Sequence, residues 1–175
     1  STAGVRRAVT ITAIDAYNNT ATGYLGTATF PSNDGQAVLP ADYTFVGGDA
    51  GTKSRNFTLK TAGEKTITAT DTVTGSITGT QTAITILPGD AATFTVSGHT
   101  DPSTAGVQRA VTITAIDAYN NSATGYLGTA TFTSSDGQAV LPADYTFVGG
   151  DAGTKSRNFT LKTAGEKTIT ATDTV

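Results

Sequence analysis

The chain repeats itself almost without change. Residues 1–73 recur as residues 103–175, an offset of 102 within a chain of 175 residues. The copies differ at four positions, which pair as Arg6 with Gln108, Thr20 with Ser122, Pro31 with Thr133, and Asn33 with Ser135. Solenoid repeats run to about 20–50 residues, whereas a whole β-sandwich domain takes about 100. The repeat therefore predicts copies of one small domain instead of a single large one.

Apolar and polar residues alternate along short segments of each copy. In one segment Val9, Ile11 and Ala13 share one face, and threonines occupy the other. A side-chain period of two is typical of half-buried antiparallel strands, and threonine suits their outer face. The same pattern predicts strands over residues 91–97, 8–14, 24–30, 41–46, 53–60, 65–70 and 77–87, with turn-forming residues between them. Without any amphipathic helix pattern, the predicted fold class is all-β, with antiparallel β-sandwiches in tandem.

The turn-forming stretch Leu87–Asp90, with the sequence LPGD, marks the expected domain boundary. It gives one domain over residues 1–88, which lacks its first strand, and another over residues 89–175, which lacks its last. We favour the interpretation that the sequence is a window on a longer array. The alternative is that neighbouring chains donate the missing strands. Because the boundary leaves few free residues between strands, we expect successive domains to form a semi-rigid rod.

Three stretches of the repeat resemble a known family: AVTITAIDAYNNTATGYLGTATF, SNDGQAVLPADYTF and DAGTKSRNFTLKTAGEKTITATD. They are similar to the bacterial immunoglobulin-like tandem repeats of very large secreted or cell-surface proteins. The segment DAYNN resembles that family's D-A-Y-G-N turn, with Asn18 and Asn120 at the glycine position, where asparagine tolerates the left-handed backbone conformation. The resemblance implies an immunoglobulin-like sandwich at an extracellular or cell-surface location. It implies no single activity, because such modules serve as stalks, spacers and adhesins.

The composition argues against several functional classes. The 11 Lys and Arg residues are spread thinly and the net charge is −3, so we expect no nucleic-acid partner. No apolar run is long enough for insertion into a membrane, and the absence of cysteine removes disulfides and thiolate sites. His99 is the single histidine, and no serine lies in a G-x-S-x-G motif. We therefore expect no enzyme and no required cofactor, with a glycosidase-like pair of carboxylates as the one catalytic alternative.

Acidic residues become a candidate metal site once the sandwich topology is imposed. If consecutive strands alternate in direction, the loops after the second, fourth and sixth strands meet at one pole. In the second copy this pole and the linker would hold Asp90, Asp117, Asn120, Asp151 and Asp173; the equivalents in the first copy are Asp15, Asn18, Asp49 and Asp71. Oxygen ligands of this kind suit Ca²⁺, which takes about six to eight of them. The alternative, which we favour, is that these side chains cap their own turns.

Two main functions fit these observations. The first is a structural spacer in a long extracellular surface, stalk or filament protein, with neighbouring repeats or neighbouring chains as its partners. The second is an adhesin-type module that recognises a glycan or a surface protein through the loop pole, where Tyr17 and Tyr119 are candidate contacts. A domain accessory to a large hydrolase is a third alternative. Glycosylation also stays open, because Asn18, Asn56, Asn120 and Asn158 lie in N-x-S/T triplets.

Overall fold

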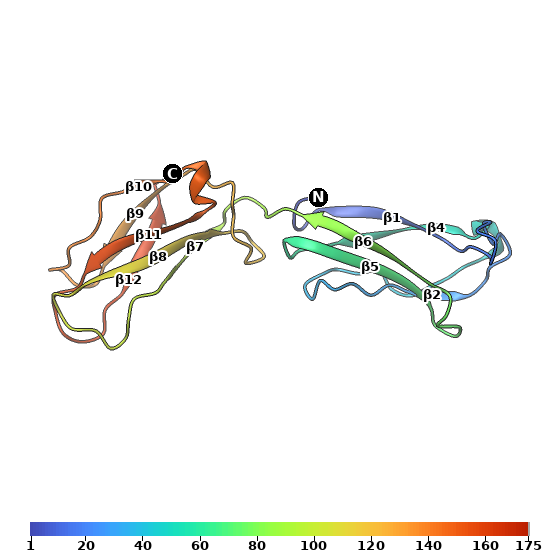
Figure 1. Cartoon of the computed structure of the whole chain (residues 1–175), viewed down its shortest axis with the longest axis horizontal. Coiled ribbons are helices and arrows are strands. Elements are labelled where there is room, and N and C mark those ends of the chain that lie inside the picture. The colour runs from blue at the N-terminus through green and yellow to red at the C-terminus, as the bar shows by residue number, and fades with distance from the viewer. Residues whose placement is uncertain (175) are drawn as a thin grey trace. The chain divides into compact units, whose positions relative to one another are not determined.

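The computed structural model describes residues 1–174 and divides the chain into two compact units, Ser1–Leu87 and Pro88–Val175. Figure 1 shows strands joined by loops and short turns in both units, and no α-helix occurs among the described residues. The strands of each unit fall into two sheets. The predicted all-β fold is therefore confirmed.

Unit 1 contains six strands and one 3₁₀ turn. They are β1 (Arg6–Thr12), β2 (Thr27–Thr29), β3 (Tyr43–Thr44), η1 (Gly47–Asp49), β4 (Thr52–Thr58), β5 (Gly63–Asp71) and β6 (Thr78–Ile86). One sheet pairs β1 with β4, and the other has the order β3-β2-β5-β6. All of these pairings are antiparallel.

The described part of unit 2 also contains six strands and one 3₁₀ turn. They are β7 (Thr93–Ser97), β8 (Gln108–Ile116), β9 (Thr129–Ser134), β10 (Tyr145–Thr146), η2 (Gly149–Asp151), β11 (Thr154–Thr160) and β12 (Ile169–Asp173). One sheet has the order β11-β8-β7 and the other the order β10-β9-β12.

The offset of 102 relates the two units strand by strand. It maps β1 to β8, β2 to β9, β3 to β10, β4 to β11 and β5 to β12, and it preserves the register, since Arg6 pairs with Thr58 and Gln108 with Thr160. Strand β7 adds a first strand beside β8, and β6 adds a last strand beside β5. The first, second and fifth strands thus share one sheet and the third, sixth and seventh the other, as in an immunoglobulin-like sandwich, while the short fourth strand pairs with the third.

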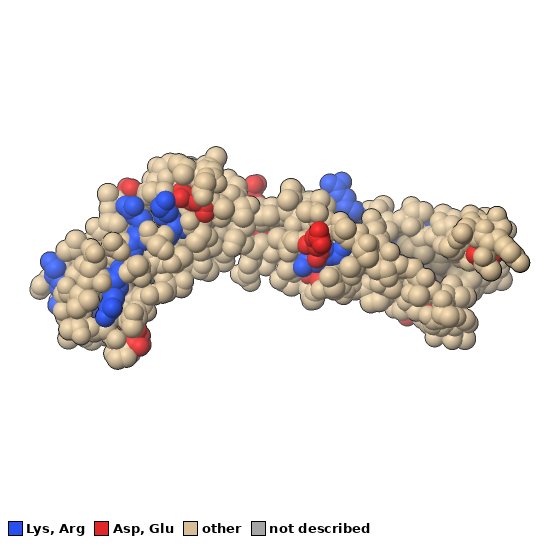
Figure 2. All heavy atoms as spheres, in the orientation of Figure 1, with Lys and Arg blue, Asp and Glu red and all other residues tan. Residues whose placement is uncertain are grey.

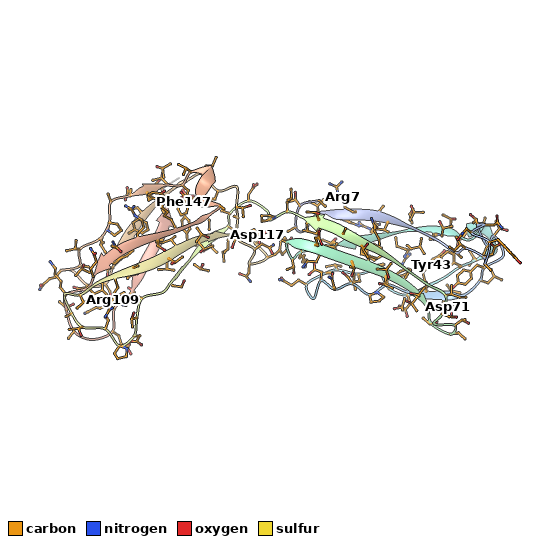
Figure 3. All side chains as sticks on the ribbon, viewed as in Figure 1. Arg7, Tyr43, Asp71, Arg109, Asp117 and Phe147 are labelled. Atoms are coloured by element: carbon orange, nitrogen blue, oxygen red, sulfur yellow. The ribbon has the colours of Figure 1, made fainter. Side chains whose placement is uncertain are left out.

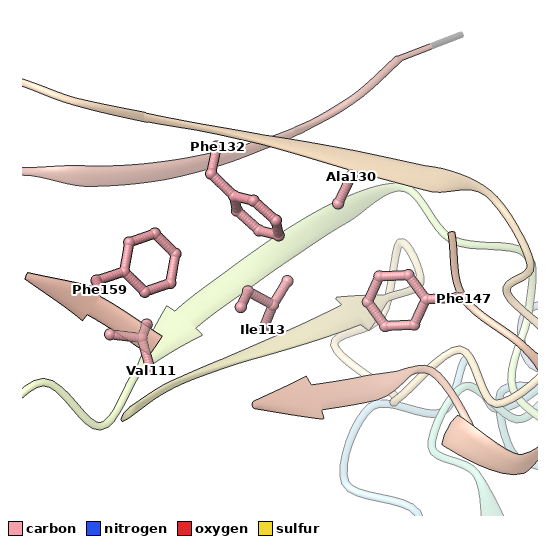
Figure 4. Packing of buried hydrophobic residues seen from close by; sticks show 6 residues of the cluster. All are labelled: Val111, Ile113, Ala130, Phe132, Phe147 and Phe159. Atoms are coloured by element: carbon pink, nitrogen blue, oxygen red, sulfur yellow. The ribbon is translucent and has the colours of Figure 1, made fainter. Parts of the chain in front are cut away.

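The core of unit 2 lies between its two sheets (Figure 4). It consists of Val111, Ile113, Ala130, Phe132, Phe147 and Phe159, none more than 7% exposed. Phe132 meets Phe159 edge to face, with 5.5 Å between the ring centroids. The alternating apolar positions of β8 thus point inward as the sequence predicts. Each large side chain buried in this way contributes about 1.5–3 kcal/mol to the free energy of unfolding.

Two strands are shorter than the sequence pattern predicts. The segment 24–30 pairs only over β2, because the backbone N–H of Tyr24 donates to Ala21 O and closes a turn before the strand begins. The segment 41–46 pairs only over β3, because the chain enters η1 directly after Val46. In both places a local turn replaces strand pairing at the end of the alternating pattern.

Candidate functional site

The loops that follow β1, β3 and β5 meet at one end of unit 1. The backbone N–H of Ala13 donates to Gly51 O at 2.8 Å, which joins the first of these loops to the second. Gly51 also lies so close to Ala21 that a Cβ on this glycine would come within 2.4 Å of the Ala21 carbonyl oxygen. The hydroxyl of Tyr24 donates to Asp71, which belongs to the end of β5. The loop pole expected from the topology is therefore present, and its carboxylates define the candidate site.

Asp117 follows β8 and is buried, with 3% of its surface exposed (labelled in Figure 3). Its Oδ1 accepts hydrogen bonds from the backbone N–H groups of Tyr119 and Asn121, at 2.8 and 2.9 Å. Its Oδ2 accepts bonds from Asn121 Nδ2 and from the N–H of Gly89, both at 2.8 Å. Burial acts to raise the pKa of this carboxyl, but the donors, Asn121 foremost, together hold the pKa below its ordinary value.

The counterpart of this turn in unit 1 is open to solvent. Asp15 is exposed and accepts from Tyr17 N–H, Asn19 N–H and Asn19 Nδ2 at 2.8–3.0 Å. The Asn19 side chain is the main cause of the lowered pKa of Asp15. Asn18 has a φ of 65°, and Asn120 in unit 2 a φ of 66°. Asparagine therefore adopts the left-handed conformation that the DAYNN turn requires.

Asp151, in η2, holds together a tyrosine and a lysine. It accepts from Tyr145 Oη at 2.8 Å and Val148 N–H at 3.0 Å, and it forms an ion pair with Lys155 Nζ at 2.8 Å. Lys155 is the largest cause that lowers the pKa of Asp151 to about 2. The Tyr145 ring also faces two cations, Lys155 Nζ at 5.0 Å and Arg157 Cζ at 4.8 Å from its centroid. The second carboxylate of the pole thus has a partner of opposite charge.

The same cluster recurs in unit 1. Asp49 accepts from Tyr43 Oη and pairs with Lys53 Nζ, both at 2.8 Å. Lys53 is again the first cause of a pKa lowered to about 2. Tyr43 is labelled in Figure 3 and faces Lys53 and Arg55, at 4.9 and 4.8 Å from its ring centroid. The cluster is therefore a property of the repeated sequence and not of one unit.

Asp71 and Asp173 receive a tyrosine hydroxyl. Asp71 accepts from Tyr24, and from Val73 and Thr74 N–H at 2.8 Å each. The N–H of Thr74 is the largest cause of its lowered pKa, followed by Tyr24. In unit 2, Tyr126 Oη donates to Asp173 at 2.6 Å. Burial, and then the neighbouring carboxylate, raises the pKa of Tyr24 to about 12.

These contacts describe how each predicted metal ligand is used. Asp117, Asp151 and Asp173 accept hydrogen bonds within unit 2, as do their equivalents in unit 1, while Asp90 and Asn120 are exposed. Over residues 1–174, no three histidine or acidic side chains form a group that could hold a metal ion. Backbone N–H groups of its own turn reach Asp117, which is the contact that the capping interpretation expects. Asp151 and Asp173 also accept from a lysine or a tyrosine hydroxyl, which that interpretation did not include. The calcium site stays a prediction, which a titration tests.

Sequence reasoning placed Asp34 at the other end of the unit but did not identify the buried, structural role that it and its counterpart Asp136 have. The pattern S-N-D-G-Q indicated a turn, but Asp34 is only 3% exposed and fastens the β2–β3 loop to the β4–β5 turn. Its Oδ2 accepts from Lys60 and Thr61 N–H at 2.6 and 3.0 Å, and its Oδ1 accepts from Thr61 Oγ1 at 2.7 Å. The Asp34-Gly35 pair indicated a turn, but it could not indicate that Asp34 accepts hydrogen bonds from residues 26 and 27 positions further along the chain.

A groove opens on unit 1 beside β1. Its volume is about 460 Å³, and it is lined by Val9 and Ile11 of β1 and by Ala13, which follows the strand. The rings of Tyr24 and Phe45 form another part of its wall, together with residues of β5 and β6. In unit 2, β7 lies against the corresponding edge of β8. The groove is therefore an apolar surface whose counterpart in unit 2 is covered by β7, a strand that lies outside the repeated residues.

Charged side chains are scattered over the face of the molecule shown in Figure 2, with no continuous area of one sign. Of the helices in the described residues, none has the length and apolar character that a bilayer span needs.

No protein-family model and no curated protein matches this chain. Two solved structures are similar to it. FdeC, an adhesin of Escherichia coli, shares 18% identity at a TM-score of 0.46 over 99% of this chain and 56% of that chain. The β-glucuronidase 3 of Bacteroides uniformis shares 14% identity at a TM-score of 0.39 over 99% of this chain and 21% of that chain. This chain thus spans less than two thirds of either, and at these scores neither likeness carries a functional argument.

Proposed function

We propose that the chain is a structural, non-catalytic spacer: a pair of immunoglobulin-like modules from a longer extracellular array at a cell surface, stalk or filament. The observation that carries this proposal is that the polar residues of the loop pole serve the fold. The carboxylates of Asp117, Asp151 and Asp71 each accept hydrogen bonds from three or four donors of their own unit. Groups engaged in this way are poorly placed to act on a substrate.

The repetition of the module supports the same proposal. The two copies keep the same strand pairing and register, and the Tyr–Asp–Lys cluster of η1 recurs at η2. A module that spans distance gains length from each added copy, whereas a catalytic site needs only one. The resemblance to bacterial immunoglobulin-like repeats supports the extracellular location.

Small-angle scattering on concatenated chains tests the spacer function. Proteins with one, two and three further 102-residue periods are prepared, and their maximum dimensions are compared. We expect the maximum dimension to grow by a nearly equal step with each period, because short linkers limit domain motion. Growth that levels off, as in a collapsed assembly, would contradict a spacer.

An adhesin is the second candidate, and the exposure of one aromatic residue favours it. Tyr17 lies in the loop after β1 with 85% of its surface exposed. Its counterpart Tyr119 is half-buried, so the two copies present different surfaces. In a longer array the inner copies would resemble unit 2, in which this tyrosine is half-buried, so the adhesin is the weaker proposal.

A glycan array probed with the two-unit chain separates the two functions. The spacer predicts no binding above that of a Tyr17→Ala control. Saturable binding that the Tyr17→Ala variant loses would favour the adhesin instead.

A further inference from the structure

We propose that the groove beside β1 is a strand-acceptor site whose occupant is one more copy of the segment 88–102, placed ahead of Ser1 as β7 is placed ahead of β8. The proposal rests on the array proposed above and names the contact by which one module completes another. It follows from a comparison of two units that have nearly the same sequence.

The edge of β1 is unpaired where the edge of β8 is paired. Strand β8 lies between β11 and β7, whereas β1 pairs with β4 alone in the described part of the chain. In unit 2, Phe94 lies opposite Ala115 and Val96 opposite Ile113. The offset of 102 places an incoming phenylalanine opposite Ala13 and an incoming valine opposite Ile11. An added antiparallel strand in this register repeats a pairing that the chain already makes.

The missing strand leaves apolar side chains uncovered in unit 1. Val111 and Ile113 of β8 are 1% and 0% exposed, whereas Val9 and Ile11, their counterparts, are only half-buried. Ile14 is 57% exposed, and its counterpart Ile116 is half-buried. Because the side chains are identical, the difference in exposure reflects the neighbouring strand. Covering them removes apolar surface from water, which favours strand binding.

The pocket for the incoming phenylalanine is already formed. In unit 2 the ring of Phe94 lies 5.3 Å from Tyr126, edge to face, and 6.1 Å from Phe147, stacked. Those two receiving rings are 5.1 Å apart at 69°. Their counterparts Tyr24 and Phe45 are 5.0 Å apart at 68°, although the described residues of unit 1 include no counterpart of Phe94. A site that needs no rearrangement binds its ligand at lower cost.

The linker supplies a second contact. Gly89 N–H donates to Asp117 Oδ2 in unit 2, and Asp117 is buried there. Asp15 presents the same carboxylate in unit 1 but is exposed. A copy of the segment 88–102 carries the equivalent glycine, so it would reach Asp15 as well as the groove. The occupant is therefore the whole linker and strand, and not the apolar strand alone.

A second copy of the chain is the poorer donor. Each chain carries one β7 and two edges that accept such a strand, those of β1 and β8. A chain that gave up its β7 would uncover its own β8 and gain nothing in buried surface. An additional copy of the segment covers the groove without opening another.

The test appends residues 88–102 directly before Ser1 in the full chain. Hydrogen exchange is then read on peptides 6–14 and 108–116, which have different masses because Arg6 replaces Gln108. We expect exchange of the β1 peptide to slow at least tenfold, to the level of the β8 peptide, which serves as the internal reference. The control is the same extension with Phe94→Ala and Val96→Ala in the added copy only, which should restore fast exchange.

Three results would overturn the proposal. The first is that the extension leaves exchange of the β1 peptide unchanged. The second is that the control extension protects this peptide equally. The third is that the unmodified chain sediments as a dimer with its β1 peptide already protected, which would assign the groove to a second copy. Failure of the spacer function is separate, because it is read from the dimensions of longer arrays and not from exchange at β1.

Discussion

Buried aspartates fasten the loops of each unit at places where no strand pairing is available. Asp34 receives four donors from the chain around it, and three of them, from Lys60 and Thr61, belong to the turn between β4 and β5. Such a carboxylate replaces the ladder of hydrogen bonds that a strand would provide, and it does so with charge-assisted bonds. At the scale of single residues, the units are therefore held by acidic side chains that point inward.

The substitution Asp34→Asn tests this role. Asparagine keeps one acceptor oxygen and turns an amide group toward the donors, so we expect unit 1 to lose about 2 kcal/mol in its free energy of unfolding. That loss corresponds to a lower melting temperature by roughly 8–16 °C for a domain of this size. Thermal unfolding followed by circular dichroism measures the shift. Asp42→Asn, at an exposed aspartate of the same unit, is the matched control and should leave the melting temperature unchanged.

The pH dependence of stability follows from the same residues. Burial acts to raise the pKa of Asp34, but hydrogen bonds from Thr61, Lys60 and Gln36 outweigh it and lower the pKa to about 2 from an ordinary value of 3.8. A carboxyl whose pKa is lower in the folded state stabilises it fully above the unfolded value and loses that effect as pH falls toward the folded value. We expect a flat melting temperature from pH 5 to 7 and a fall between about pH 4 and pH 2. If the melting temperature of the Asp34→Asn variant fell by the same amount over this acidic range, the assignment to this carboxyl would be contradicted.

Calcium binding is a further question at the residue scale. The pole carboxylates already accept hydrogen bonds from turn N–H groups, from Lys155 and from tyrosine hydroxyls. We therefore expect the melting temperature to be the same in millimolar Ca²⁺ and in excess EDTA. A rise with Ca²⁺, abolished by Asp117→Asn, would establish the metal site in place of the capping role.

At the scale of elements, one sequence gives strands of different length in the two units. The segment GEKTITATD forms all nine residues of β5 in unit 1, but its counterpart forms only the five residues of β12. Strand β5 lies between β2 and β6, whereas β12 pairs with β9 alone among the described residues. Strand β8 is likewise longer than β1, nine residues against seven, and it has β7 as an additional neighbour. Strand length is therefore set by neighbouring strands as much as by local preference.

The sequence could predict those features of the fold that depend on neighbouring residues, but not those that depend on distant ones. The alternation around Val9 and Ile11 predicts a strand and its inward face correctly, because that information is local. The burial of Asp34 and the pairing of Tyr24 with Asp71 could not be predicted, since they depend on partners 26 to 47 residues away. The turn at Asn18 was predictable, because its left-handed backbone follows from the local residue types. The strands and turns could therefore be predicted from local sequence, whereas the hydrogen-bond partners at the candidate site depend on tertiary contacts.

The contact between two pole loops gives a prediction at the element scale. Gly51 has a φ of 75°, and a Cβ there would come within 2.4 Å of Ala21 O. We expect Gly51→Ala to lower the free energy of unfolding of unit 1 by about 2 kcal/mol or more, because both the backbone and the neighbouring loop must shift. Chemical denaturation measures it. Gly35→Ala is the control, because a Cβ at Gly35 meets no atom within 4 Å, and an equal effect of both substitutions would contradict this reason.

At the scale of the whole molecule, two copies of one module differ in which strand they have gained. Unit 1 carries the last strand, β6, and unit 2 carries the first strand, β7. The exposure of the β1 side chains and the burial of those of β8 follow from this difference. We therefore infer that the neighbouring strand, and not a sequence change, sets how far the side chains of β1 and β8 are covered. Strands β2 and β9 differ in sequence as well, with Pro31 in the position of Thr133.

Native-state hydrogen exchange on the unmodified chain tests that claim most directly. Peptides 6–14 and 108–116 differ only at Arg6 and Gln108, so they report the same nine positions in the two units. We predict that the β8 peptide exchanges at least tenfold more slowly than the β1 peptide, because β7 covers one edge of β8 and the edge of β1 is open. Equal exchange of the two peptides would contradict the account.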